Sequence, residues 1–142
     1  MRRPELHRPP RAGFTWPVRV YYEDTDLGGV VYYANYLKFL ERARSEWLRH
    51  LGVSQVQLLE TERLLFAITA VDIRYLKPAR FEDELTVTVE LERLRRASMS
   101  FHQAIYRGGV DGELLCTAQV TAACLDADAM RPRALPAHLF TE

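Results

Sequence analysis

The sequence predicts an α+β domain in which an antiparallel sheet packs against one long helix. Three observations predict it. Residues 36–51 repeat apolar side chains at helical spacing, four later segments alternate apolar with polar side chains, and turn signals separate these segments. A chain of 142 residues can bury a full core without disulfides. We therefore expect one domain over residues 16–142, preceded by a flexible tail, residues 1–15, that is rich in arginine and proline.

The first elements follow from local composition. Residues 18–22 are β-branched and aromatic, which predicts a strand. Gly52 predicts the end of the long helix. Ser54, with Gln57 three residues later, predicts the capped start of a second, short helix. The apolar face of the long helix is predicted to consist of Tyr36, Leu40, Ala43, Trp47 and Leu51.

After residue 64 the apolar period changes to two, which predicts four more strands. They cover about residues 65–75, 84–92, 98–107 and 114–125. Cys116 and Cys124 fall on the apolar face of the last strand, about 26 Å apart along it, which is too far for a disulfide. We expect both to be buried free thiols in a reducing compartment.

Charge and hydropathy exclude several classes of function. The chain has 19 basic and 19 acidic residues, so it presents no net field to nucleic acid or to an anionic membrane. Of the basic residues, 17 are arginine, the side chain suited to forked contacts with phosphate and carboxylate. No apolar run is long enough to span a bilayer, and the first residues lack the apolar segment of a secretory signal. We expect a cytoplasmic protein without stable membrane insertion.

The densest group of chemically useful side chains lies in residues 22–36, before the long helix. It comprises Glu23, Asp24, Asp26, Gly28, Gly29, Tyr22, Tyr32, Tyr33 and Tyr36. In one interpretation, the aspartates close a turn or cap the helix. In the other, the glycines let a carbonyl group approach free N–H groups at the helix start, while a neighbouring carboxylate attacks it or activates water. A calcium loop fits poorly, because the glycine comes one residue early and Asn35 replaces the bidentate glutamate.

This segment resembles a known signature. Residues 24–36, followed by residues 39–44, look like the motif of the hotdog-fold acyl-CoA thioesterases. More narrowly, they resemble the 4-hydroxybenzoyl-CoA thioesterase family and its Tol-Pal-associated YbgC-type branch. Residues 75–83 and 130–136 are similar to that branch as well. The resemblance covers about residues 16–138.

The resemblance implies a hotdog fold, a five-stranded antiparallel sheet wrapped around one long helix. It implies hydrolysis of an acyl-CoA thioester to free acid and CoA. Asp26 then acts as nucleophile or as general base, and the backbone N–H of Tyr33 at the helix start polarises the thioester carbonyl. One position departs from the pattern, because many YbgC-type members carry histidine where this chain has Tyr33, whereas the aryl-CoA members carry tyrosine.

The resemblance also implies where a substrate binds. From their aromatic side chains, Tyr32, Tyr33, Tyr36 and Phe66 are expected to line the acyl group, although each can equally be ordinary core. Arg95, Arg96 and Ser98 are expected to contact the CoA phosphates, although their segment can also be a solvated turn. We expect a homodimer that assembles into a homotetramer, with acyl carrier protein as a candidate partner. No cofactor is expected beyond the CoA of the substrate.

Two other functions remain open from the sequence. A hotdog dimer can hold an acyl-CoA or acyl carrier protein as a binding module without turning it over; the presence of Asp26 argues against this. A dehydratase on the same fold needs a catalytic histidine, and none can be placed in the motif. The four histidines have no metal-ligand spacing, and no Cys-x-x-Cys occurs, so a metal-free mechanism is expected.

Overall fold

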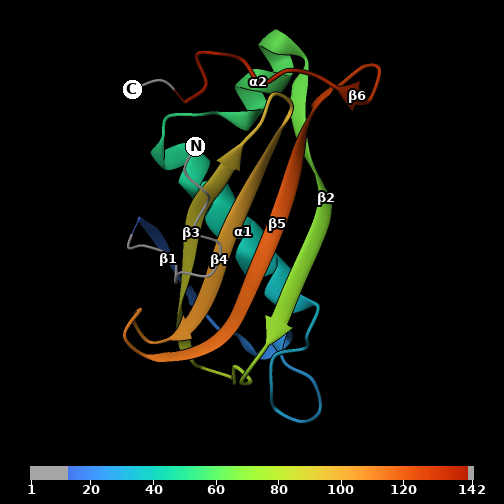
Figure 1. Cartoon of the computed structure of the whole chain (residues 1–142). Coiled ribbons are helices and arrows are strands. Elements are labelled where there is room, and N and C mark those ends of the chain that lie inside the picture. The colour runs from blue at the N-terminus through green and yellow to red at the C-terminus, as the bar shows by residue number, and fades with distance from the viewer. Residues whose placement is uncertain (1–12, 141–142) are drawn as a thin grey trace.

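The computed structural model describes residues 13–140. One long helix lies in the curve of an antiparallel sheet (Figure 1), which confirms the predicted hotdog architecture. In chain order the elements are β1 (Phe14–Arg19), the 3-10 turn η1 (Tyr22–Asp24), α1 (Asn35–His50), α2 (Gln55–Glu62), β2 (Leu64–Tyr75), β3 (Glu84–Leu94), β4 (Ser98–Arg107), β5 (Glu113–Asp126) and β6 (Arg131–Pro132).

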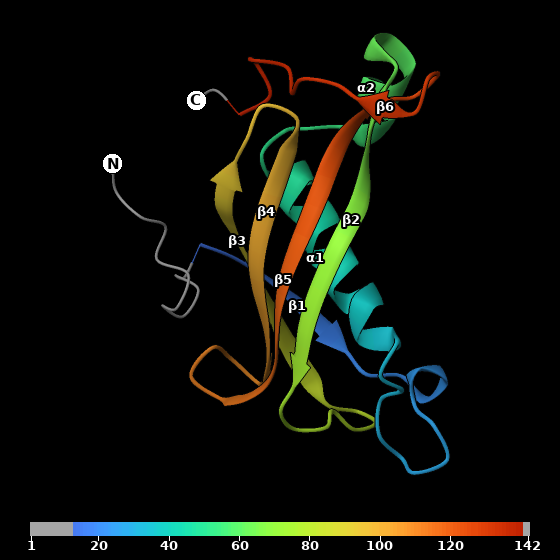
Figure 2. The ribbon, with the colours of Figure 1, turned by 45° about the vertical axis from the view of Figure 1, so that its right-hand side comes forward.

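The five long strands are arranged in the order β1-β3-β4-β5-β2, and β6 adds a short hydrogen-bonded segment to β5. Every pairing between these strands is antiparallel. β1 and β2 therefore form the two edges of the sheet. Among the described elements, α1 covers one face of the sheet and no helix covers the other (Figure 2).

The core lies between α1 and the facing side chains of the sheet. Alternate residues of β3, β4 and β5 point toward the helix, and Trp47 of α1 packs edge-on against Phe101 of β4, with ring centroids 5.3 Å apart. Four of the five residues predicted for the buried helix face are buried. The fifth, Leu51, is 46% exposed, because α1 ends before it and Gly52 then turns the chain with a φ of +84°.

A buried amide ties the helix to the sheet. Gln103 of β4 is fully buried, and its side-chain nitrogen donates to the carbonyl oxygens of Leu40, at 3.1 Å, and Thr88, at 3.3 Å. Its side-chain oxygen accepts a hydrogen bond of 3.0 Å from the guanidinium of Arg44. Burial lowers the pKa of Arg44. Gln103 thus cross-links α1, β3 and β4, a contact that the sequence did not predict.

The predicted first strand is displaced. The sequence predicts residues 18–22, whereas β1 covers Phe14–Arg19, and the next residues bend into η1. Phe14 and Thr15, assigned to the tail, therefore belong to the sheet; residues 1–12 lie outside the described part of the chain. Pro17 is tolerated in β1 because an edge strand leaves one side of its backbone without hydrogen-bond partners.

Two other local predictions are confirmed. The Ser54 hydroxyl accepts a 3.1 Å hydrogen bond from the backbone N–H of Gln57 and so caps α2. Cys116 and Cys124 are buried free thiols, and burial raises the pKa of Cys116 to about 12. In residues 13–140, neither helix combines the length and hydropathy needed to cross a membrane.

Candidate active site

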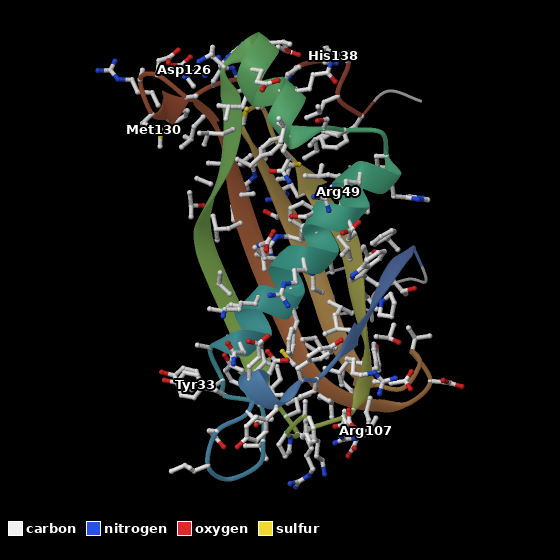
Figure 3. The ribbon with its side chains drawn as sticks, turned by 180° about the vertical axis from the view of Figure 1, so that it is seen from behind. Tyr33, Arg49, Arg107, Asp126, Met130 and His138 are labelled. Carbon is white, nitrogen blue, oxygen red and sulfur yellow. The ribbon has the colours of Figure 1, made fainter. Side chains whose placement is uncertain are left out.

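The segment between β1 and α1, residues 20–34, folds into a compact loop at one end of the sheet. Two isolated bridges hold it: Thr25 pairs with Val31, and Val30 pairs with Arg80 of the β2–β3 connection. The backbone N–H of Val31 donates to the carbonyl of Ala79 at 2.8 Å. Figure 3 shows this loop at the lower end of the molecule, with the labelled Tyr33 pointing outward. The predicted chemical segment is therefore an ordered platform before the long helix.

Asp24 closes this loop. Its side chain accepts a 2.8 Å hydrogen bond from the backbone N–H of Tyr21, which caps η1. Its carbonyl accepts from the backbone N–H of Tyr32 at 3.0 Å and from the side-chain amide of Asn35 at 2.9 Å. Asp24 thus joins the turn to the start of α1. This confirms the interpretation of Asp24 as a turn-closing residue.

Asp26 lies two residues later and has different partners. Its Oδ1 accepts a 2.9 Å hydrogen bond from the N–H of Gly28, and its backbone N–H donates to Val30 at 2.9 Å. Its Oδ2 has no hydrogen-bond or ion-pair partner within residues 13–140, and the side chain is exposed. A Cβ on Gly28 would stand 3.3 Å from Oδ1, so glycine leaves room for this carboxylate. One carboxylate oxygen is held, and the other is open to a ligand.

The start of α1 presents free N–H groups. Ala34 is the N-cap and provides no side-chain cap. In the described range, the backbone N–H groups of Tyr33 and Ala34 donate to no acceptor, whereas that of Asn35 donates to Tyr32 at 2.8 Å. The positive end of the helix dipole lies at the same place. The arrangement can stabilise negative charge that develops on an oxygen atom.

Tyrosines surround the helix start, but they differ in exposure. Tyr32 and Tyr33 are 47% and 61% exposed, and their ring centroids are 4.9 Å apart. Tyr36 is 3% exposed, and its hydroxyl accepts a 3.0 Å hydrogen bond from the N–H of Ala79. Tyr36 therefore offers a substrate almost no surface, and its position fits the alternative interpretation of a core residue. Tyr75, at the end of β2, also reaches this cluster, which the sequence did not predict.

The remaining predicted site residues lie at the other end of the molecule. Phe66 is close to the start of β2, nine residues before Tyr75, which corresponds to about 30 Å along a strand. Arg95 and Arg96 occupy the turn between β3 and β4, and Ser98 begins β4 at the same end. Both arginines are exposed and pair with no carboxylate in the described residues. A single chain therefore does not bring these residues to Asp26.

Phe66 lies at a cavity of about 160 Å³ between α1 and the sheet. Its floor is apolar and includes Ile68, Met99 and Phe101, and Glu41 and Arg44 of α1 also line it. The sequence indicated Phe66 but not this cavity, because the lining residues come from five elements far apart along the chain.

In residues 13–140, no cluster of histidine, cysteine and carboxylate side chains is suited to a metal ion. The metal-free mechanism stays a prediction.

Comparison with known proteins decides the family. The family model described as "Thioesterase-like superfamily" matches residues 20–140. The chain belongs to the thioesterase-like superfamily. This thioesterase-like protein is 46% identical to the acyl-CoA thioester hydrolase YbgC of Escherichia coli O6:H1 over 91% of this chain and 94% of the relative. It is 45% identical to the acyl-CoA thioesterase YbgC of Haemophilus influenzae, over 87% and 89% of the two chains.

A solved structure agrees with these relatives. The probable thioesterase from Bartonella henselae superposes on the thioesterase-like chain with a TM-score of 0.81 and 38% identity, over 87% of this chain and 100% of that one. The family resemblance expected from the motif is confirmed, and with it the expected class of enzyme, a thioester hydrolase.

Proposed function

We propose that the protein hydrolyses acyl-CoA thioesters to a free acid and CoA. The observation that carries the proposal is that one loop contains both an exposed Asp26 carboxylate and the backbone N–H groups of Tyr33 and Ala34 at the start of α1. Among residues 13–140, neither one oxygen of this carboxylate nor these two N–H groups has a hydrogen-bond partner. A carboxylate and a group of oxyanion donors are the two parts that thioester hydrolysis without a metal needs. The relatives named as acyl-CoA thioester hydrolases support the substrate class.

Two routes use the same atoms. As a nucleophile, the free oxygen of Asp26 attacks the thioester carbon, and the resulting oxyanion accepts hydrogen bonds at the helix start. The C–S bond then breaks, CoA leaves as a thiolate that takes a proton from solvent, and water hydrolyses the mixed anhydride. As a general base, Asp26 takes a proton from a water molecule that attacks the same carbon, and this proton passes to the leaving sulfur. Both routes restore Asp26.

A panel of acyl-CoAs assayed with a free-thiol reagent tests this function. The panel contains short, medium and long aliphatic chains and aromatic acyl groups, and the Asp26→Asn variant serves as the matched control. We expect at least one thioester to release CoA with wild-type protein and a large loss of turnover in the variant. A protein that only binds acyl-CoA or acyl carrier protein releases no CoA above the spontaneous rate, and that result contradicts the proposal.

We propose further that the working unit contains two copies joined along β2. This edge strand exposes Ile68 (45%), Val71 (41%) and Tyr75 (43%) on its helix-facing side, and its outer backbone groups have no strand partner among the described elements. An exposed apolar edge favours pairing with another strand. Antiparallel pairing of two β2 strands about a twofold axis would set the Phe66 and Arg95 end of one copy beside the Asp26 end of the other. The homotetramer and the acyl carrier protein partner stay predictions.

A further inference from the structure

The hydroxyl of Tyr75 makes a long-range hydrogen bond to the candidate active site. It donates to the carbonyl oxygen of Tyr33 at 3.0 Å, across 42 positions of sequence. That carbonyl belongs to the peptide whose N–H is the N–H of Ala34. The bond therefore joins the end of β2 to the peptide from which α1 begins.

The helix start has few other restraints. Ala34 gives no side-chain cap, and among the described residues the only other donor to the Tyr33 carbonyl is the N–H of Tyr36, at a longer 3.3 Å. The N–H of Leu37 reaches the carbonyl of Ala34 at 3.2 Å. Of the hydrogen bonds to the Tyr33 carbonyl, the one from Tyr75 is the shorter. The orientation of the Tyr33–Ala34 peptide thus depends strongly on the Tyr75 hydroxyl.

The Tyr75 ring is itself held in place. It packs edge-on against Tyr36, with ring centroids 5.1 Å apart, and edge-on against Tyr33 at 6.2 Å. Tyr36 is anchored in the core by its hydrogen bond from Ala79. Partial burial raises the pKa of the Tyr75 hydroxyl, so it stays protonated and remains a donor at neutral pH. A fixed ring with a permanent donor is suited to positioning.

A second effect acts through the peptide bond. A carbonyl that accepts hydrogen bonds polarises its peptide and makes the N–H at the other end a stronger donor. The N–H of Ala34 has no acceptor within the described residues and lies beside the free N–H of Tyr33. The hydrogen bond from Tyr75 therefore orients the peptide and strengthens the donor that this peptide presents.

We propose that Tyr75 is a positioning residue for thioester hydrolysis, which holds the Tyr33–Ala34 peptide so that the free N–H groups at the start of α1 face the substrate carbonyl. This inference rests on the proposed function. Tyr75, at the end of the edge strand β2, then contributes to the rate of turnover as well as to the edge of the sheet. Tyr75 does not touch the reacting atoms in this assignment.

Tyr75→Phe removes the hydroxyl and keeps the ring. We expect kcat for the best acyl-CoA of the panel to fall about tenfold, which is less than the loss of a direct oxyanion donor, with KM unchanged within about twofold. Tyr106→Phe, the same substitution on the opposite face of the sheet, should leave kcat unchanged. Sedimentation must give the same mass for the variant and the wild type, because Tyr75 also lies at the proposed dimer edge. A wild-type kcat in Tyr75→Phe overturns the inference.

Two unnatural residues at position 75 test the donor itself and cover the case in which Tyr75→Phe fails to fold. p-Methylphenylalanine fills the space of the hydroxyl without a donor, and p-aminophenylalanine restores an N–H donor. We expect the amino variant to recover most of the wild-type kcat and the methyl variant to stay low. Equal rates for the two variants would show that the hydroxyl only fills space.

A spectroscopic readout separates this inference from the proposed function. The Asp26→Asn variant should bind an acyl-CoA labelled with ¹³C at the thioester carbonyl and shift its infrared stretch to lower frequency. With Tyr75→Phe added, we expect a smaller shift, and an unchanged shift contradicts the role of Tyr75. If instead the wild-type protein releases no CoA from any thioester of the panel, the proposed function itself fails, and if Asp26→Asn retains wild-type turnover, the role proposed for Asp26 fails, whatever Tyr75 does.

Discussion

Asp24 and Asp26 stand two positions apart and carry the same functional group, yet the fold gives them different partners. The Asp24 side chain accepts from Tyr21 and its carbonyl holds Tyr32 and Asn35, so it is occupied by the loop. Asp26 is held through one oxygen by Gly28, and its other oxygen has no partner in the part of the chain that the structure describes. The difference between the structural carboxylate and the one proposed to react therefore lies in hydrogen-bond partners that short-range spacing did not distinguish.

The two aspartates should respond differently to the same substitution. Asp26→Asn should lower kcat by about a thousandfold and leave the midpoint of thermal unfolding within a few degrees, because it removes a reactive oxygen and keeps the shape. Asp24→Asn should cost about 1 kcal/mol of stability through the weakened cap, with a smaller effect on kcat. Steady-state kinetics check the two kcat values, thermal unfolding checks the midpoint, and urea unfolding checks the loss of stability. Equal losses of kcat in the two variants would contradict the assignment.

At the scale of the elements, the helix and the sheet are joined by polar as well as apolar contacts. The period of α1 and of the strands predicted which faces are buried, and most of those residues are in the core. Gln103 occupies an inward position where the pattern favours an apolar side chain, and its amide bonds to α1 and β3. Periodicity assigns a residue to a face, but it does not show which groups on the opposite element will meet it.

Replacement of this amide should be costly. Gln103→Leu leaves the half-buried Arg44 guanidinium without its acceptor and removes two hydrogen bonds between elements. We expect a loss of about 2–3 kcal/mol in the free energy of unfolding, measured in urea. The matched control, Gln57→Leu on the exposed face of α2, should change stability by less than about 0.5 kcal/mol. Similar values for the two variants would show that the buried amide contributes little.

At the scale of the whole molecule, the single chain separates the predicted substrate contacts. The loop between β1 and α1, which carries Asp26 and Tyr33, lies at one end (Figure 1). The start of β2, which carries Phe66, and the β3–β4 turn, which carries Arg95 and Arg96, lie at the other end. The outer edge of β2, which pairs with no other described strand, would bring these ends together in the proposed assembly of two copies. The predicted contacts are then distributed between the two chains.

A charge on this edge should separate the copies. Val71→Lys places an ammonium group on the exposed apolar side of β2, and we expect sedimentation to show the mass of one chain where the wild type shows a multiple. Turnover should fall in the same variant, because in the proposed assembly the second copy completes the active site. Val56→Lys, at an exposed valine of α2, is the matched control and should change neither quantity. A wild-type protein that is already a monomer contradicts the proposed assembly.

The turn arginines give a second test at this scale. A double substitution, Arg95→Gln with Arg96→Gln, should raise KM for an acyl-CoA about tenfold because the phosphates lose two charged partners. Turnover of the matching acyl-pantetheine, which lacks the nucleotide phosphates, should be unaffected, and so should the unfolding midpoint. An unchanged KM for acyl-CoA would contradict a role in CoA binding and would favour the alternative interpretation, in which both arginines belong to a solvated turn.

The sequence by itself determined the types of the elements, the buried face of α1 and the loop that carries the candidate chemistry. These follow from local periodicity, turn residues and a contiguous motif. Only the tertiary structure decided that β1 begins at Phe14, that the Tyr36 hydroxyl bonds to Ala79, that Tyr75 meets Tyr33 and that Phe66 lies far from Asp26. Those facts depend on strand order and on register between segments distant in the chain, which no short-range spacing encodes.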